Sequence, residues 1–220
     1  MRKLALAIAA VISMTTAASA AEPVAYDHLV LSLSWSPTWC ATKAGQKDEE
    51  QCGAKKFGFV VHGLWPQFGK GQSHDCPDAT GEVPAKAAEQ ILPVMPSHKL
   101  IGHEWERHGV CFGNDPIAYF AKARAAADKV KIPASLRGAD KAREMTADDI
   151  RKAFVEANAG LPPDGLAISC RKPKGKDAAA VQQFDLNDVR ICLDKDLKFR
   201  PCAKTIRDRC PGKARLAAAK

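Results

Sequence analysis

The stretch FGFVVHGLWPQ at residues 57–67 is the most informative part of this sequence. Its first half is almost wholly apolar, which predicts a β-strand over residues 57–62. Gly63 and Pro66 then indicate a turn that ends the strand. His62 is therefore expected at a strand end, where folds tend to present catalytic groups.

A second stretch, GHEWERHGVC at residues 102–111, predicts a helix that carries several ionisable groups. Residues four apart share one face of a helix, so His103 lies beside Arg107. By the same rule Glu104 lies beside His108. The first pair can grip a phosphate. In the second pair, a carboxylate can support a histidine that must accept a proton.

Together the two stretches place three histidines beside one acid and one fixed cation. One histidine can take the proton from a ribose 2′-OH, and another can return a proton to the departing 5′-oxygen. Cationic side chains can hold the phosphate while negative charge builds on it. These residue types predict RNA cleavage that needs no metal and no other cofactor.

A zinc hydrolase is the competing interpretation of the second stretch, because a neighbouring His and Glu suggest the HExxH motif. That motif needs its histidines four residues apart, so that both reach one metal. His103 and His108 are five apart, roughly 140° around an ideal helix rather than 40°. Arg107 lies between them and disfavours a dication. We therefore expect no metal ligand among these residues.

The first twenty residues predict a secretory signal peptide. Arg2 and Lys3 form a positive start, and the apolar run from Leu4 to Ile12 is too short to span a bilayer. Residues 18–20 form an A-x-A cleavage site, so the mature chain is expected to begin at Ala21. An uncleaved membrane anchor is the alternative. We expect a mature protein outside the cytoplasm, periplasmic or secreted, with no membrane association.

The cysteines agree with an oxidising compartment. All eight lie after the predicted signal peptide, which indicates four disulfides. The number alone allows 105 pairings. The chain also carries a net charge of +8, which suits a polyanionic partner such as RNA but also fits ordinary solubility.

The remaining patterns alternate between short strands and short helices. Further strands are predicted over residues 27–35, 166–170, 184–186 and 189–193. Helices are predicted over residues 84–92, from a cap at Ser97 to Gly109, over 115–130, and from a capping box at Thr146 to Gly160. The basic tail is expected to be loose beyond Cys210. These elements predict a single α+β domain, with a central, mainly antiparallel sheet flanked by helices.

Four segments of the chain resemble those of a known protein family. FVVHGLWP and HEWERHGVC closely resemble the two signature segments of the ribonuclease T2 family. LSLSWSPTWC at 31–40 and VRICLDKDLKFRPC at 189–202 resemble its first strand and its late strand with a cysteine pair. The signal peptide and the cysteines make the chain look like a bacterial periplasmic member, of the ribonuclease I type. The resemblance implies that residues 21–220 form one catalytic domain.

The resemblance also implies roles for individual residues. His108 resembles the general base and His62 the general acid. His103, Glu104 and Arg107 resemble the residues that bind and polarise the phosphate, although the family usually has lysine in place of Arg107. For the nucleotide site, Trp65 resembles a base-stacking residue. Gln67 stands where the family often has an aspartate, which makes strict base choice less expected.

The resemblance alone implies how the eight cysteines pair. The pairs are Cys76 with Cys111, Cys40 with Cys52, Cys170 with Cys210, and Cys192 with Cys202. The resemblance further implies a monomeric endoribonuclease of low base specificity, acting through 2′,3′-cyclic phosphate ends and sparing DNA, which lacks the attacking 2′-OH. A catalytically inactive RNA-binding protein on the same fold is the alternative, but both His62 and His108 are present.

Overall fold

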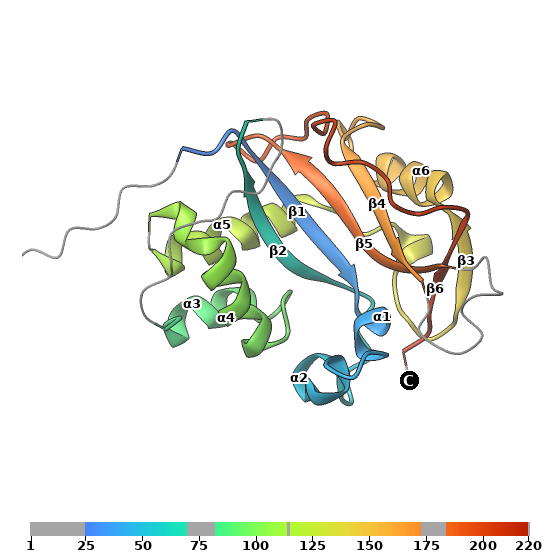
Figure 1. The fold of residues 1–220 in the computed structure, drawn as a ribbon, viewed down its shortest axis with the longest axis horizontal. Coiled ribbons are helices and arrows are strands. Elements are labelled where there is room, and N and C mark those ends of the chain that lie inside the picture. Colours follow the sequence, from blue (N-terminus) through green and yellow to red (C-terminus); the bar gives the residue numbers. More distant parts are fainter. Residues whose placement is uncertain (1–24, 70–81, 114, 173–183, 220) are drawn as a thin grey trace, which may run out of the picture.

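The computed structural model describes residues 25–69, 82–113, 115–172 and 184–219, and Figure 1 labels their elements. The strands are β1 (His28–Trp35), β2 (Phe59–Gln67), β3 (Arg143–Thr146), β4 (Leu166–Arg171), β5 (Phe184–Leu193) and β6 (Lys213–Leu216). The helices are α1 (Ser36–Cys40), α2 (Glu49–Cys52), α3 (Ala85–Ile91), α4 (His98–Arg107), α5 (Pro116–Lys129) and α6 (Ala147–Ala157).

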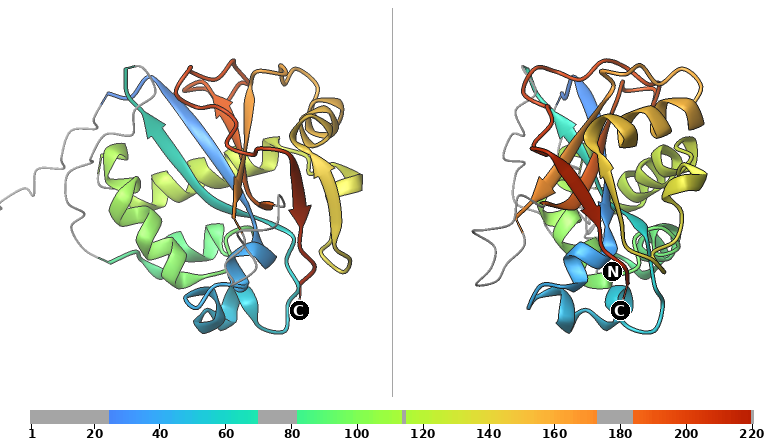
Figure 2. Two further views of the ribbon diagram at one scale, coloured as in Figure 1. Left: turned by 45° about the vertical axis from the view of Figure 1, so that its right-hand side comes forward. Right: turned by 90° about the vertical axis from the view of Figure 1, so that its right-hand side faces the viewer.

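One six-stranded sheet organises the fold. The strand order is β2-β1-β5-β6-β3, and β4 pairs with β5. The pairings are antiparallel, except that between β5 and β6. Figures 1 and 2 show α5 and α6 against one face of the sheet, and α1 and α2 at the end of β1. The predicted α+β class is confirmed.

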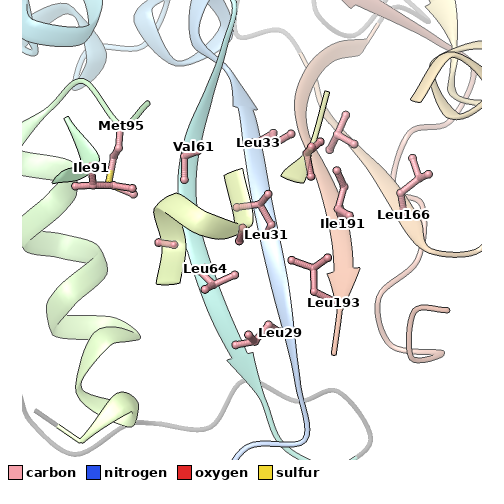
Figure 3. Close-up of a cluster of buried hydrophobic side chains, with 14 of the residues drawn as sticks. Leu29, Leu31, Leu33, Val61, Leu64, Ile91, Met95, Leu166, Ile191 and Leu193 are labelled. Carbon is pink, nitrogen blue, oxygen red and sulfur yellow. The ribbon is translucent and has the colours of Figure 1, made fainter. Parts of the chain in front are cut away.

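The core lies between the sheet and the helices. Leu29 and Leu31 of β1 meet Leu64 of β2 and Ile191 of β5, and all four are fully buried (Figure 3). Met95, in the segment between α3 and α4, packs against the same cluster. Burial of each such side chain contributes about 1.5–3 kcal/mol, so this cluster fixes β1 and β2 together.

Strand β2 is longer than the sequence patterns predicted. It continues through Gly63 and Pro66 to Gln67, so the predicted turn after His62 is wrong. The proline is tolerated because β2 is an edge strand, where a missing N–H breaks no central ladder. The register with β1 jumps between Val61 and Gly63, which leaves His62 as the extra residue of a β-bulge. A bulge redirects its side chain, and here it redirects the histidine.

The C-terminal tail is also more ordered than expected. Residues 213–216 form β6, which pairs with β5 and with β3. Ala214 and Leu216 are fully buried, and the backbone oxygen of Ala217 accepts a hydrogen bond of 2.9 Å from Trp35 Nε1. Buried and more exposed residues alternate along β6 for only four positions, which is too short a pattern to recognise in a basic sequence. The expectation of a loose tail beyond Cys210 is therefore wrong.

Three disulfides lie within the described residues. They join Cys40 to Cys52, Cys170 to Cys210, and Cys192 to Cys202, which are pairs that the family resemblance implies. Cys111 is disulfide-bonded as well. Its predicted partner, Cys76, lies outside the described residues. That pairing stays a prediction, which peptide mapping without reduction can test.

The buried tail yields a stability prediction. Leu216→Ala should lower the free energy of unfolding by about 2–5 kcal/mol, because it empties a fully buried site. Lys213→Ala, on the exposed side of the same strand, should change it by less than about 0.5 kcal/mol. Urea denaturation of both variants checks this. Equal, small effects would mean that β6 is not part of the cooperative fold.

Candidate active site

The site is built around Glu104, a carboxylate that α4 carries into the protein. Ile101, Glu104 and Trp105 are the buried residues of this helix, spaced three and four apart on one face. Glu104 is only 1% exposed. The cap of the helix is as predicted, since the Ser97 hydroxyl accepts a hydrogen bond from the Leu100 backbone N–H.

Three side chains surround this carboxylate. Trp65 Nε1 donates a hydrogen bond of 2.8 Å to Glu104 Oε2. His62 Nε2 lies 3.4 Å from Oε1, and His108 Nε2 lies 4.0 Å from Oε2. A buried carboxylate is costly unless it is paired, so the indole and the two imidazoles stabilise it. The predicted pairing of Glu104 with His108 is present, and His62 joins it from the sheet.

Gly63 allows this close approach. A Cβ atom at this position would lie 1.8 Å from Glu104 Oε2 and 2.6 Å from Trp65 Nε1. Any other residue would therefore push β2 away from α4 and separate the hydrogen-bonded pair. The sequence patterns had assigned this glycine to a turn, and its role as a contact point becomes visible only in three dimensions.

His108 follows the last residue of α4 rather than lying within the helix. The helix ends at Arg107, His108 is its C-cap, and Gly109 begins a short 3-10 turn (Gly109–Phe112). The backbone N–H of His108 still donates to the Glu104 carbonyl, at 2.9 Å. A Cβ at Gly109 would meet the ring of the core residue Trp105 at 2.0 Å, so glycine is required here too.

Trp65 lies between the two histidines. Its ring centroid is 5.5 Å from that of His62 and 5.6 Å from that of His108. The guanidinium of Arg190, on β5, lies over the same ring at 5.3 Å. Arg190 is held by the buried carboxylate of Asp188, at 2.8 Å. This ion pair was missed from the sequence, where Asn187 and Asp188 seemed to divide β5 into two strands.

The two histidines have opposite pKa shifts. Burial alone lowers the pKa of His62, but the hydrogen bond and the negative charge of Glu104 outweigh burial, so its pKa is raised. At His108, burial is again the largest effect and lowers the pKa. Glu104 opposes this, while the positive charges of His62, His103 and Arg107 add to it. His62 therefore keeps its proton to a higher pH than His108 does.

His103 and Arg107 lie on the exposed face of α4. His103 also lines a cavity of about 360 Å³ that His62 borders. The cavity has an apolar lining from Trp35, Trp39 and Leu100. The sequence patterns gave no indication of it, because its walls come from β1, α1 and α4, which are far apart along the chain.

Gln67 is placed differently from the other predicted site residues. It is only 5% exposed, and its amide nitrogen donates to the backbone oxygens of Trp65 and Pro66, at 3.3 and 3.1 Å. These bonds hold the amide against its own strand. The geometry gives no support to contact between Gln67 and a base.

Comparison with known proteins agrees with this architecture. A sequence profile of the ribonuclease T2 family matches residues 26–202, which include all the predicted catalytic and substrate-binding residues. The chain belongs to the ribonuclease T2 family. A protein named ribonuclease from Aeromonas hydrophila is 32% identical over 176 residues, covering 78% of this chain and 73% of that protein.

Another relative in the ribonuclease T2 family is a probable ribonuclease from Haemophilus influenzae. It is 34% identical over 120 residues, covering 49% of this chain and 44% of that protein. A crystal structure of a ribonuclease MC1 variant in complex with 5′-UMP has the same fold. Its TM-score is 0.63 at 22% identity, and the match covers 87% of this chain and 98% of that one.

Two further observations bear on the site's surroundings. The described residues contain no group of three or more His, Cys, Asp or Glu side chains placed to hold a metal ion. Among the described helices, none combines the length and the apolar character needed to span a bilayer.

The central carboxylate yields a titration prediction. Glu104→Gln should lower the pKa of His62, because burial remains while the negative charge that raises the pKa is lost. The pKa of His108 should also fall, since Glu104 raises it too. NMR titration of the imidazoles measures both values. Glu106→Gln, on the exposed face of the same helix, is the control and should leave both pKa values unchanged. An unchanged pKa of His62 in Glu104→Gln would show that Glu104 does not set the protonation of this histidine.

Proposed function

We propose that this chain is an endoribonuclease that cleaves RNA by transesterification through a 2′,3′-cyclic phosphate. The observation that carries the proposal is the pair of histidines held on either side of Glu104, with pKa values shifted in opposite directions. A neutral base and a protonated acid are what this reaction needs at its start. The family and its relatives that are named ribonucleases support the assignment.

In the first step, neutral His108 takes the proton of the ribose 2′-OH. The 2′-oxygen attacks the neighbouring phosphorus and forms the cyclic phosphate. Protonated His62 gives its proton to the 5′-oxygen as the P–O5′ bond breaks. The products are one strand that ends in a cyclic phosphate and one that begins with a 5′-hydroxyl.

Glu104 acts on the histidines rather than on the phosphate. A buried carboxylate next to a phosphate would repel it, whereas beside His62 it stabilises the imidazolium. His103 and Arg107 are exposed and cationic when protonated, so they are the residues that contact the phosphate oxygens. This division refines the roles that the family resemblance implies for Glu104, His103 and Arg107.

Hydrolysis of the cyclic phosphate can follow in the same site. His62 is neutral after the first step and takes a proton from water, while His108, now protonated, returns one to the 2′-oxygen. DNA is not a substrate, because it lacks the 2′-OH that attacks in the first step. No metal or other cofactor takes part in either step.

The leaving nucleotide occupies the cavity beside His62. Trp39 and Leu100, which are partly exposed, give it an apolar lining, and the Trp39 ring can accept any base by stacking. Gln67 is tied to its own backbone and selects no base. We therefore expect low base specificity. On the other side of the scissile phosphate, Trp65 remains the candidate for stacking the upstream base.

The enzyme acts outside the cytoplasm, in the periplasm or the medium. Residues 1–20, which lie outside the described residues, have the pattern of a cleaved signal peptide. The disulfides fit an oxidising compartment. Residues 21–220 are then a single catalytic domain that works as a monomer.

One assay tests the proposal. The purified mature protein is incubated with RNA and with DNA of the same sequence, in excess EDTA, and the product ends are identified. RNA should yield cyclic phosphate and 5′-hydroxyl ends, and DNA should stay intact. On the sixteen dinucleoside monophosphates, rates should differ by about tenfold at most, or about 1.4 kcal/mol. Loss of activity in EDTA with recovery on adding zinc, or 5′-phosphate ends, would contradict the mechanism.

A further inference from the structure

Three cationic side chains follow one face of α4. Lys99, His103 and Arg107 are four residues apart, so each lies about 6 Å further along the helix than the one before. All three are exposed. The proposed mechanism uses His103 and Arg107 at the phosphate that is cleaved. It gives no role to Lys99, which lies one helical turn beyond His103.

Lys99 also lines the cavity beside His62, and so does a second cation from another part of the chain. This is Arg171, at the end of β4. In the described part of the chain, neither side chain forms a hydrogen bond or an ion pair with another residue. Two cations that border one cavity, with no partner among the described residues, leave their charge available to an anionic ligand.

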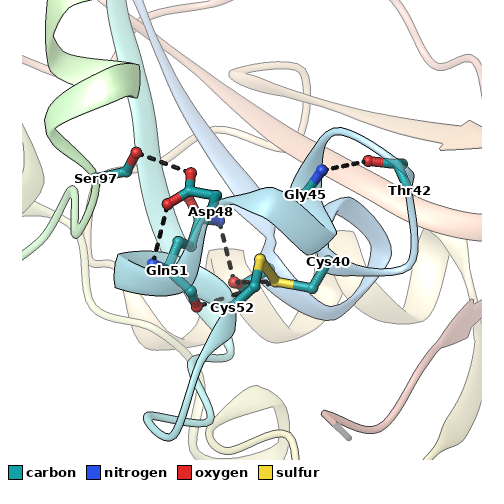
Figure 4. Close-up of a disulfide and its surroundings, with 8 residues drawn as sticks. Cys40, Thr42, Gly45, Asp48, Gln51, Cys52 and Ser97 are labelled. Carbon is teal, nitrogen blue, oxygen red and sulfur yellow. Dashed lines mark hydrogen bonds between the residues drawn. A yellow bond between two sulfur atoms is a disulfide. The ribbon is translucent and has the colours of Figure 1, made fainter.

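The acidic groups nearby already have partners. Asp48 lines the cavity, but its carboxylate accepts hydrogen bonds from the Ser97 hydroxyl at 2.8 Å and the Gln51 backbone N–H at 3.3 Å (Figure 4). Glu50 is paired with His98 at 2.6 Å. The neutral donors around Asp48 hold its carboxylate in place without cancelling its charge. The two fixed cations of the cavity lining, Lys99 and Arg171, still outnumber this one carboxylate.

Asp185, which stands opposite Arg171 in the sheet, is paired with Arg215 at 2.6 Å. It is therefore engaged by another arginine. Arg171 remains available to a ligand in the cavity.

We propose that Lys99 and Arg171 bind a second phosphate of the RNA, the one that follows the leaving nucleotide. The inference rests on the proposed function. His62 gives its proton to the leaving 5′-oxygen, so the nucleotide in the cavity is the downstream one. Its own 3′-phosphate lies one nucleotide further along the strand, in the direction in which Lys99 lies beyond His103. The strand then runs 5′ to 3′ from Arg107 towards Lys99.

The inference predicts which substrates are cleaved well. UpA and UpAp have the same cleavable bond and differ only in a 3′-terminal phosphate. The wild-type protein should cleave UpAp with a kcat/KM about tenfold higher, mainly through a lower KM, as two charge pairs near the surface allow. The advantage should shrink with added salt, because both cations are near the surface. pUpA carries its extra phosphate at the other end and controls for charge alone.

Variants assign the effect to the two cations. In the double variant Lys99→Gln with Arg171→Gln, the ratio of kcat/KM for UpAp to that for UpA should fall to within about twofold of one. Its ratio for pUpA to UpA should equal that of the wild type. Lys99→Arg should keep the preference for UpAp. Lys152→Gln, which removes an exposed charge from α6, should keep it as well.

The outcomes separate this inference from the proposed function. A wild-type ratio near one, or a ratio that survives in the double variant, would overturn it. An equal loss of the preference for UpAp in Lys152→Gln would also overturn it. Binding of the 2′-deoxy analogues of UpA and UpAp, which cannot be cleaved, provides the same comparison without catalysis. If UpA is not cleaved at all, the proposed function fails, while tighter binding of the phosphorylated analogue would still support the second phosphate site.

Discussion

The buried carboxylate of Glu104 is the interaction on which the rest of the site depends. It is 1% exposed and meets Trp65, His62 and His108 within 4.0 Å. A carboxylate in this position is stable only if donors and positive charge face it. The same charge raises the pKa of His62 and limits the fall in the pKa of His108. One group therefore sets both the geometry and the protonation of the two histidines.

Several features of the fold position the side chains that meet at Glu104. A β-bulge turns His62 towards α4, and Gly63 leaves the space that the carboxylate occupies. The start of α4 is held in turn by Ser97, whose hydroxyl accepts from Leu100 and donates to Asp48, in the loop that the Cys40–Cys52 disulfide closes (Figure 4). The helix is thus fixed at its start by a capping hydrogen bond and near its end by the carboxylate.

The sequence alone was sufficient for the local features. Helical spacing pairs Glu104 with His108, and the structure has them together. It was insufficient where contacts join distant segments. The contact between Gly63 and Glu104, the cavity and strand β6 all depend on residues far apart in the chain or on patterns of only four residues. The Asp188–Arg190 pair was missed for another reason, because Asn187 and Asp188 seemed to interrupt the strand on which both residues lie. Gln67, chosen by its place in a motif, is instead bonded to its own strand.

The rate of UpA cleavage against pH tests the central claim most directly. The wild-type rate should rise as His108 loses its proton and fall as His62 loses its own, with a broad optimum around the ordinary histidine pKa of about 6.5. His108→Ala should lose the rising limb and His62→Ala the falling limb, each with a rate at least about a hundredfold lower. The account would be contradicted if His108→Ala lost the falling limb and His62→Ala the rising limb. It would also be contradicted if both variants kept a bell-shaped pH–rate profile.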